Sequence, residues 1–206
     1  MAKTALGFTI KSGWACAVVL SGTERTPQVI DARRIELSDP ADADARQPYH
    51  ATFGTARKPG PRLEQLLDAV QRFGRRSVGD FIRDQQNSEP RLVGAGIVAG
   101  SLVDPATIGN EHIRIHALEG QLFRGIVSDA AARRPLPAAV WRERDLYDAA
   151  VERLKRSEPD IRQTVTALGR GREGPWRAEH KAAALAAWLV LAGSRGPGRG
   201  PGRGRP

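Results

Sequence analysis

The beginning of the chain alternates apolar and polar stretches in the manner of β-strands. Residues 5–10 and 15–21 form two short apolar runs, and Lys11-Ser12-Gly13 separates them. Because glycine tolerates the backbone angles of a tight turn, this pattern predicts a β-hairpin. A third run over residues 28–37 predicts another strand, and a polar loop from Asp39 to His50 follows it. The chain is therefore expected to open with three consecutive strands.

Beyond residue 60 the pattern changes to helices that alternate with short strands. Over residues 61–86 the apolar side chains recur at the spacing of one helix face. The other expected elements are a strand over 92–98, a helix over 104–129, a strand over 138–142, and helices over 146–155, 159–168 and 178–192. The resulting order, β-β-β-α-β-α-β-α, predicts an α/β domain with a mixed sheet and flanking helices.

Basic residues outnumber acidic ones, 32 to 23, and give the 206-residue chain a formal net charge of +9. This charge favours an anionic partner, nucleic acid above all. From residue 193 the sequence is almost entirely Gly, Pro and Arg, which predicts a disordered tail over 193–206 after one domain over 1–192. Its arginines are Arg195, Arg199, Arg203 and Arg205. Such a tail either binds nucleic acid by charge alone or serves only solubility.

Cysteine content and hydropathy limit where the protein is expected to work. The single cysteine, Cys16, lies inside an apolar strand, so we expect a core residue and no internal disulfide. The sequence has no apolar run of 18 residues and does not begin like a signal peptide. These features predict a cytoplasmic protein without a membrane partner.

The element order resembles the ribonuclease H-like superfamily, and within it the Holliday-junction resolvases of the RuvC type. The hairpin over residues 6–20 resembles the opening of these proteins and of the related actin-like kinases. The segment from His112 to Val127 resembles the small-residue helix after their central strand, and Ala182-Ala-Ala-Leu-Ala-Ala-Trp-Leu resembles their final helix. The resemblance covers residues 6–191 and implies the ribonuclease H-like fold.

The resemblance also implies a metal site, but the acids of that site are missing from this chain. The positions that match the metal-binding acids are Thr9, Gly100 or Ser101, His180 and Ala183. The nearest carboxylate is Glu179, and Lys11 adds a cation. A hard divalent metal needs carboxylate oxygen, and two-metal hydrolysis needs several carboxylates together. We therefore expect a degenerate site without metal or cofactor, and a non-catalytic role in binding nucleic acid, DNA or structured RNA, or in scaffolding.

The loop after the third strand carries a weaker resemblance, to the central domain of class 1 release factors and their ribosome-hibernation relatives. This loop spans residues 46–62 and contains Tyr49, His50, Arg57 and Lys58. The Gly-Gly-Gln motif of peptide release is missing. The implied alternative is a ribosome-associated factor that contacts RNA through a basic loop.

Two histidines and a glutamate share one face of the helix expected over 104–129. His112, His116 and Glu119 stand at i, i+4 and i+7, a spacing compatible with metal binding. The zinc signature His-Glu-x-x-His is absent, and a polar helix face or satisfied buried histidines explain the spacing more simply. The corresponding alternative is a metal-dependent nuclease or other hydrolase that uses a non-standard site near Asp104, His112 and His116.

The remaining candidates are polar groups at turns and strand ends, and each also has a purely structural explanation. The Lys11-Ser12 turn can present backbone donors to phosphate, or can be a simple hairpin turn. Arg142 and Arg144 follow a strand, at the edge where open α/β sheets bind ligands, or are ordinary surface charges. A possible stacking and phosphate-binding patch consists of Arg170, Arg172, Trp176 and Arg177. Trp176 can equally pack onto the body of the domain.

Overall fold

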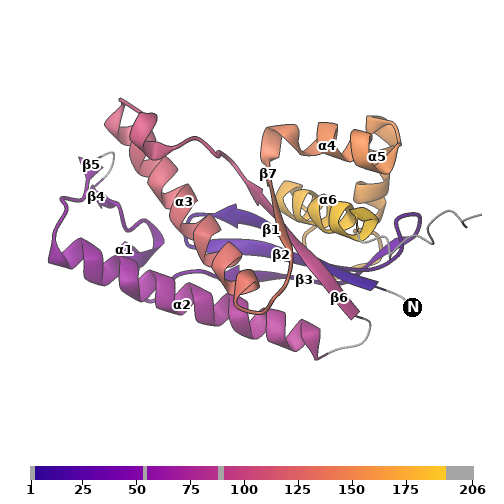
Figure 1. Ribbon diagram of the computed structural model, residues 1–206, viewed down its shortest axis with the longest axis horizontal. Helices are drawn as coiled ribbons and strands as arrows, with labels where there is room; N and C mark the ends of the chain where they lie inside the picture. Colours follow the sequence, from indigo (N-terminus) through magenta and orange to yellow (C-terminus); the bar gives the residue numbers. More distant parts are fainter. Residues whose placement is uncertain (1–2, 53–54, 88–90, 194–206) are drawn as a thin grey trace, which may run out of the picture.

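Five strands form one mixed sheet in the order β3-β2-β1-β6-β7 (Figure 1). The structure is a computed structural model that describes residues 3–52, 55–87 and 91–193. The strands are β1 (Lys3–Lys11), β2 (Trp14–Gly22), β3 (Pro27–Glu36), β6 (Arg91–Ala99) and β7 (Ala138–Arg142). The first three form an antiparallel meander, while β6 runs parallel to β1 and β7 runs parallel to β6. The carboxyl ends of β1, β6 and β7 therefore meet at one edge of the sheet.

Helices cover both faces of the sheet (Figure 1). One face carries α2 (Pro61–Gln86) and α3 (Glu111–Ala132), and the other carries α6 (Ala178–Gly193). The short helices α4 (Leu146–Leu154) and α5 (Glu158–Ala167) pack against α6 from outside. Because α6 lies between the sheet and these helices, nearly all of its side chains from Ala182 to Ala192 are buried, which explains why this part of the helix has no polar face.

Successive side chains of β1 point to opposite faces of the sheet, and each face is covered by a different helix layer. Leu6 and Phe8 belong to the core under α2 and α3, and Ala5 belongs to the core around α6. Gly7 faces α6, where an added Cβ would lie 1.8 Å from the carbonyl oxygen of Ala183. This period of two is the ordinary consequence of strand geometry. It places Thr9, two residues further along, next to the first turn of α6.

The mixed α/β architecture predicted from the sequence is confirmed, and the approach of the final helix to the first strand is confirmed with it. The bounds of α2 and β7 agree with those expected from periodicity. The expected helix start at Asp104 was wrong. That segment forms only the one-turn 3-10 helix η1 (Pro105–Thr107), and α3 begins at Glu111, where the Asn110 side chain accepts a hydrogen bond from the Ile113 N–H.

The polar loop after β3 contains elements that the sequence pattern did not predict. They are the short helix α1 (Ala43–Arg46) and a small hairpin of β4 (His50–Thr52) and β5 (Thr55–Ala56). A further 3-10 turn, η2 (Glu143–Asp145), joins β7 to α4. None of the helices in the described ranges is long and apolar enough to cross a membrane. The tail arginines, Arg195, Arg199, Arg203 and Arg205, lie outside the described residues.

Candidate functional site

A pocket of about 550 Å³ lies at the edge where the carboxyl ends of β1 and β6 meet. Lys11 and Ser12 border it from the β1–β2 turn, and Ser101 borders it from the segment after β6. His116 and Phe123 border it from α3. The fold thus brings together three groups that the sequence placed at separate candidate sites: the hairpin turn, the end of the central strand and the helix histidines.

Thr9 occupies the end of β1 but has a structural role there. It is buried, and its hydroxyl donates a hydrogen bond of 2.9 Å to the backbone carbonyl of Glu179 in the first turn of α6. Cys16, its register partner on β2, is also buried. Burial raises the pKa of the Cys16 thiol to about 12, with Glu179 adding to the rise and Lys11 opposing it. The thiol is therefore protonated at neutral pH.

The segment leading into α6 brings basic groups next to the end of β1. The backbone N–H of Arg177 donates to Nδ1 of His180 at 3.3 Å. Burial lowers the pKa of His180, Glu179 opposes this, and the positive charges of Arg177 and Arg172 lower it further. Arg170 is exposed on the same connection. This corner of the sheet edge therefore combines one carboxylate, Glu179, with basic groups, and the described residues form no cluster of carboxylates here.

Trp176 packs onto the body of the domain. Its indole N–H donates to the carbonyl of Val165 in α5 at 2.9 Å, and its ring lies 5.8 Å from that of His180. The indole also closes over Gly169, because a Cβ there would lie 2.2 Å from the ring. These contacts fit the packing explanation of Trp176, and they give it a fixed position beside the basic groups.

At the ends of β6 and β7 the polar candidates already have partners. Arg142 and Arg144 both form ion pairs with Asp145, the latter at 3.5 Å. The carbonyl of Ser101 accepts a hydrogen bond of 3.0 Å from the Arg124 guanidinium. The Asp104 carboxylate caps η1 by accepting from the Ala106 N–H at 3.0 Å. Asp104 therefore acts as a local cap and is not part of the histidine group described next.

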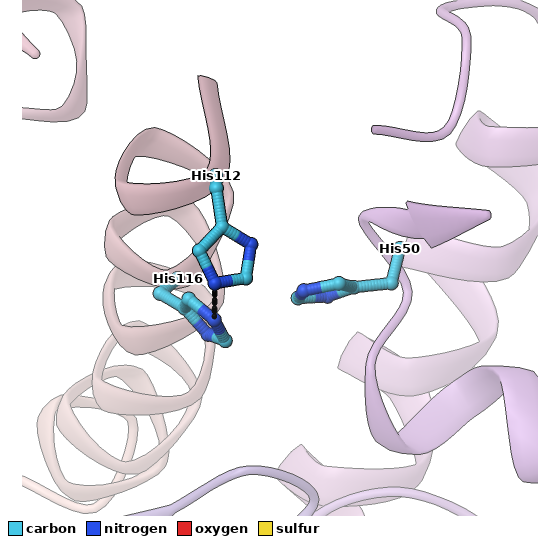
Figure 2. Close-up of side chains that lie close together, drawn as sticks. All are labelled: His50, His112 and His116. Carbon is cyan, nitrogen blue, oxygen red and sulfur yellow. Dashed lines mark hydrogen bonds between the residues drawn. The ribbon is translucent and has the colours of Figure 1, made fainter. Parts of the chain in front are cut away.

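Three histidines converge beside this edge (Figure 2). His112 and His116 lie one turn apart on α3, and His50 points toward them from β4 on the other side of a shared gap. One ring nitrogen from each lies within 4.8 Å of the other two. The Nε2 atoms of His112 and His116 are 3.3 Å apart, and the rings of His50 and His116 are 4.9 Å apart at their centroids.

Glu119 lies beneath the three histidines and contacts His50. It is only 1% exposed, and its Oε1 accepts a hydrogen bond of 2.7 Å from Nδ1 of His50. Burial raises the pKa of Glu119 above its ordinary value, while His50 opposes the rise. Burial and the neighbouring His50 and His112 lower the pKa of His116, because three close imidazoles cannot all carry a proton. His116 therefore has a free nitrogen lone pair at neutral pH.

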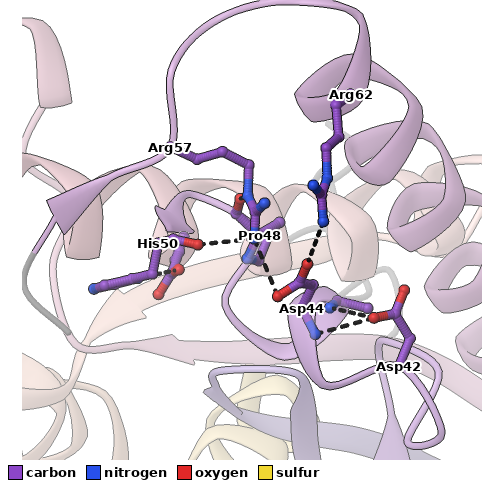
Figure 3. A network of polar contacts seen from close by, with 8 residues as sticks. Asp42, Asp44, Pro48, His50, Arg57 and Arg62 are labelled. Atoms are coloured by element: carbon purple, nitrogen blue, oxygen red, sulfur yellow. Dashed lines mark hydrogen bonds and ion pairs between the residues drawn. The ribbon is translucent and has the colours of Figure 1, made fainter. Parts of the chain in front are cut away.

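Arg57 holds the backbone around His50 in place (Figure 3). Its guanidinium donates to the carbonyls of Pro48 at 3.0 Å and His50 at 2.9 Å, and pairs with Asp44 at 3.2 Å. Asp42 caps the helix α1 that carries Asp44. These contacts fix the direction in which His50 leaves β4. Sequence reasoning treated Arg57 only as a basic loop residue, and no local pattern connected His50 with α3.

The order of the strands and the helices on both faces define an α/β domain of the ribonuclease H-like class. Solved structures that are similar to this chain include that of Thermus thermophilus RuvC, with a TM-score of 0.52 and 9% sequence identity over 90% of this chain and 92% of that one. A second structure, T. thermophilus RuvC in complex with Holliday junction substrate, gives a TM-score of 0.54 and 10% identity over 91% of each chain. No family model and no curated protein sequence matches the chain. These comparisons establish the fold.

Proposed function

We propose that this protein binds structured nucleic acid without cutting it, and that branched DNA lies across the edge formed by the carboxyl ends of β1, β6 and β7. The observation that carries the proposal is the combination of a RuvC-like fold with basic groups at that edge, where the described residues form no cluster of carboxylates. One of the solved RuvC structures is a complex with a Holliday junction substrate. Because fold likeness alone is weak support for function, the side chains present at this edge have to support the proposal.

The side chains available to bind metal ions at this edge support a non-catalytic role. Hydrolysis by two metal ions needs carboxylates that converge on both cations. Across the described ranges, a single group of three or more His, Cys, Asp or Glu side chains is close enough to share a metal ion, and it consists of three histidines. At the end of β1, the Thr9 hydroxyl is engaged with the carbonyl of Glu179.

The distribution of charge supports the choice of an anionic partner. Lys11 lies at the end of β1, and Arg172 and Arg177 precede α6 close to the same corner. Arg142 and Arg144 lie at the end of β7, where Glu143 and Asp145 balance their charge. Phosphate contacts of this kind provide affinity without reading base sequence.

Binding to a four-way DNA junction, a DNA duplex and a structured RNA, measured by fluorescence anisotropy over a range of salt, tests the proposal. We expect binding that weakens steeply with salt and requires no divalent metal. The double variant Lys11→Gln/Arg177→Gln should bind more weakly, and its log–log salt dependence should be shallower by about 2, since each lost phosphate contact removes about 0.9 from the slope.

The matched control is Arg83→Gln/Arg91→Gln, at the end of α2 and the start of β6, on the opposite edge of the sheet. Both double variants lower the net charge of +9 by two, so an effect of overall charge would reduce their affinity for nucleic acid equally. If the two double variants lose the same affinity, the proposal that nucleic acid binds at this edge is wrong. No binding by the wild type at low salt contradicts the function itself, and a clear preference for RNA favours the ribosome-associated alternative.

A further inference from the structure

We infer that His50, His112 and His116 form a binding site for a divalent transition metal of the zinc class, and that Glu119 holds His50 in the ligating orientation. This inference is independent of nucleic-acid binding. It also differs from the arrangement expected from the sequence, in which Glu119 was a candidate third ligand beside His112 and His116.

The distances among the three imidazoles suit a tetrahedral metal ion. With Zn–N bonds of 2.0–2.1 Å, two ligating nitrogens of a tetrahedral site are about 3.3 Å apart. The Nε2 atoms of His112 and His116 are 3.3 Å apart, and the nitrogens of all three histidines lie within 4.8 Å of one another. A small rotation of the His50 ring therefore completes the triangle.

The contact between Glu119 and His50 is the kind of support that metal-binding histidines receive. The carboxylate accepts from Nδ1 of His50 at 2.7 Å, which leaves Nε2 as the nitrogen with a free lone pair. The other carboxylate oxygen, Oε2, is buried and makes no hydrogen bond of ordinary geometry with the described residues, although the Tyr49 backbone N–H also lowers the pKa of this carboxyl group. A buried carboxylate is costly unless a positive charge compensates it, and a cation bound by His50 supplies that charge.

The site is also held in place before any ligand arrives. Arg57, with a side chain only 12% exposed, bonds the carbonyls of Pro48 and His50 and pairs with Asp44. His112 and His116 stand on a regular helix of 22 residues, one turn apart. Histidines from two segments that are more than 60 residues apart in sequence therefore converge, and the Arg57 contacts hold the backbone at His50.

Ligand chemistry selects the class of metal. Imidazole nitrogens suit Zn²⁺ and its neighbours in the first transition series, whereas Mg²⁺ and Ca²⁺ require oxygen ligands. Three protein ligands leave a fourth position for water. His116 borders both the pocket of about 550 Å³ at the sheet edge and a second one of about 540 Å³ next to His50 and Asp44, so this position is open to solvent.

Titration of the full chain with ZnSO4, followed by calorimetry, tests the inference directly. The protein is prepared without a histidine tag and treated with a chelator. We expect one Zn²⁺ per chain, and with Co²⁺ a visible absorption band typical of nitrogen ligands in a four-coordinate site. His50→Ala, His112→Ala and His116→Ala should each lose the one-to-one binding, and their circular dichroism spectra report whether each remains folded.

The fourth histidine of the chain provides the matched control, because His180 lies in α6 on the opposite face of the sheet. His180→Ala should bind Zn²⁺ like the wild type. No one-to-one binding by the wild type, or equal loss in His112→Ala and His180→Ala, overturns the site. Because His112 is exposed, a folded His112→Ala that binds Zn²⁺ normally also overturns it.

Glu119→Gln tests the positioning role separately. Loss of such a supporting carboxylate weakens metal affinity by about 10–100-fold, and we expect that loss here. If Glu119 has only a structural role, Glu119→Gln should lower the melting temperature of the metal-free protein without changing its Zn²⁺ affinity. That result overturns the role of Glu119, while the histidine variants still decide whether the site exists.

Discussion

The close approach of α6 to the sheet predicts that Gly7→Ala is strongly destabilising. The new Cβ would lie 1.8 Å from the carbonyl oxygen of Ala183 and 3.0 Å from the backbone nitrogen of Ala187, whereas ordinary contacts begin at 3.4 Å. These neighbours are helix backbone, so no side chain can rotate away. The helix has to retreat by about 1.6 Å, the difference between 3.4 and 1.8 Å, or the strand has to bend.

The expected magnitude follows from the two opposing effects of the added methyl group. Overpacking of a core costs typically 1–3 kcal/mol and occasionally more, whereas removing a glycine from a strand interior gains about 0.5–1 kcal/mol. Since α6 is surrounded by core on both sides, its retreat also loosens the contacts of Trp188. We expect a net loss of about 2 kcal/mol or more in the free energy of unfolding.

Urea unfolding followed by circular dichroism measures this loss. With a slope of about 2 kcal/mol per molar urea, the midpoint should fall by about 1 M. Gly120→Ala is the matched control: it lies inside α3 with no atom within 4 Å of the added Cβ, and alanine there should stabilise by up to about 1 kcal/mol. If Gly7→Ala is as stable as Gly120→Ala, the close packing of α6 on β1 is wrong.

Four further predictions concern the sheet edge, the thiol and the tail. Mg²⁺ or Mn²⁺ should not induce cleavage of four-way junctions or RNA–DNA hybrids, because the resemblance implies that Thr9 and Ala183 replace metal-binding acids. Cleavage abolished by Asp104→Ala or Glu179→Ala would show that the site was misplaced. Removal of residues 194–206 should leave the domain folded and make nucleic-acid binding weaker and less salt-dependent, since four arginines are lost; identical salt slopes would exclude the tail from binding. Cys16, buried and with a pKa raised to about 12, should react with iodoacetamide only after unfolding, and rapid labelling of the native protein would contradict its burial. The pKa of His180 is lowered from 6.5 in the folded protein, so the unfolded chain takes up a proton first as the pH falls. The free energy of unfolding should therefore decrease below about pH 6.5. Chemical denaturation should show a smaller decrease in His180→Asn.

Local sequence patterns determined most of the elements of this protein. The apolar spacing over 61–86 gave the bounds of α2, and the run after the two prolines gave those of β7. These predictions succeed because helix and strand periods are properties of consecutive residues. The start of α3 was missed because Asp104 and Asn110 are both good capping residues, and sequence alone did not show that Asp104 caps only a single 3-10 turn.

Local sequence patterns predicted less of the candidate sites than of the helices and strands. His112 and His116 were predictable as neighbours on one helix face, because a separation of four residues fixes that geometry. The contact of His50 with Glu119 depends instead on the fold, because the β4–β5 hairpin is held in place by contacts such as Arg57–Asp44. In the same way, the resemblance alone predicted that Thr9 replaces an acid. Its hydrogen bond to Glu179, 170 positions later in the chain, follows from the parallel pairing of β1 with β6 and from the glycines that let α6 settle on both strands. Convergence of distant residues is set by topology and close packing, and no periodicity along the chain encodes it.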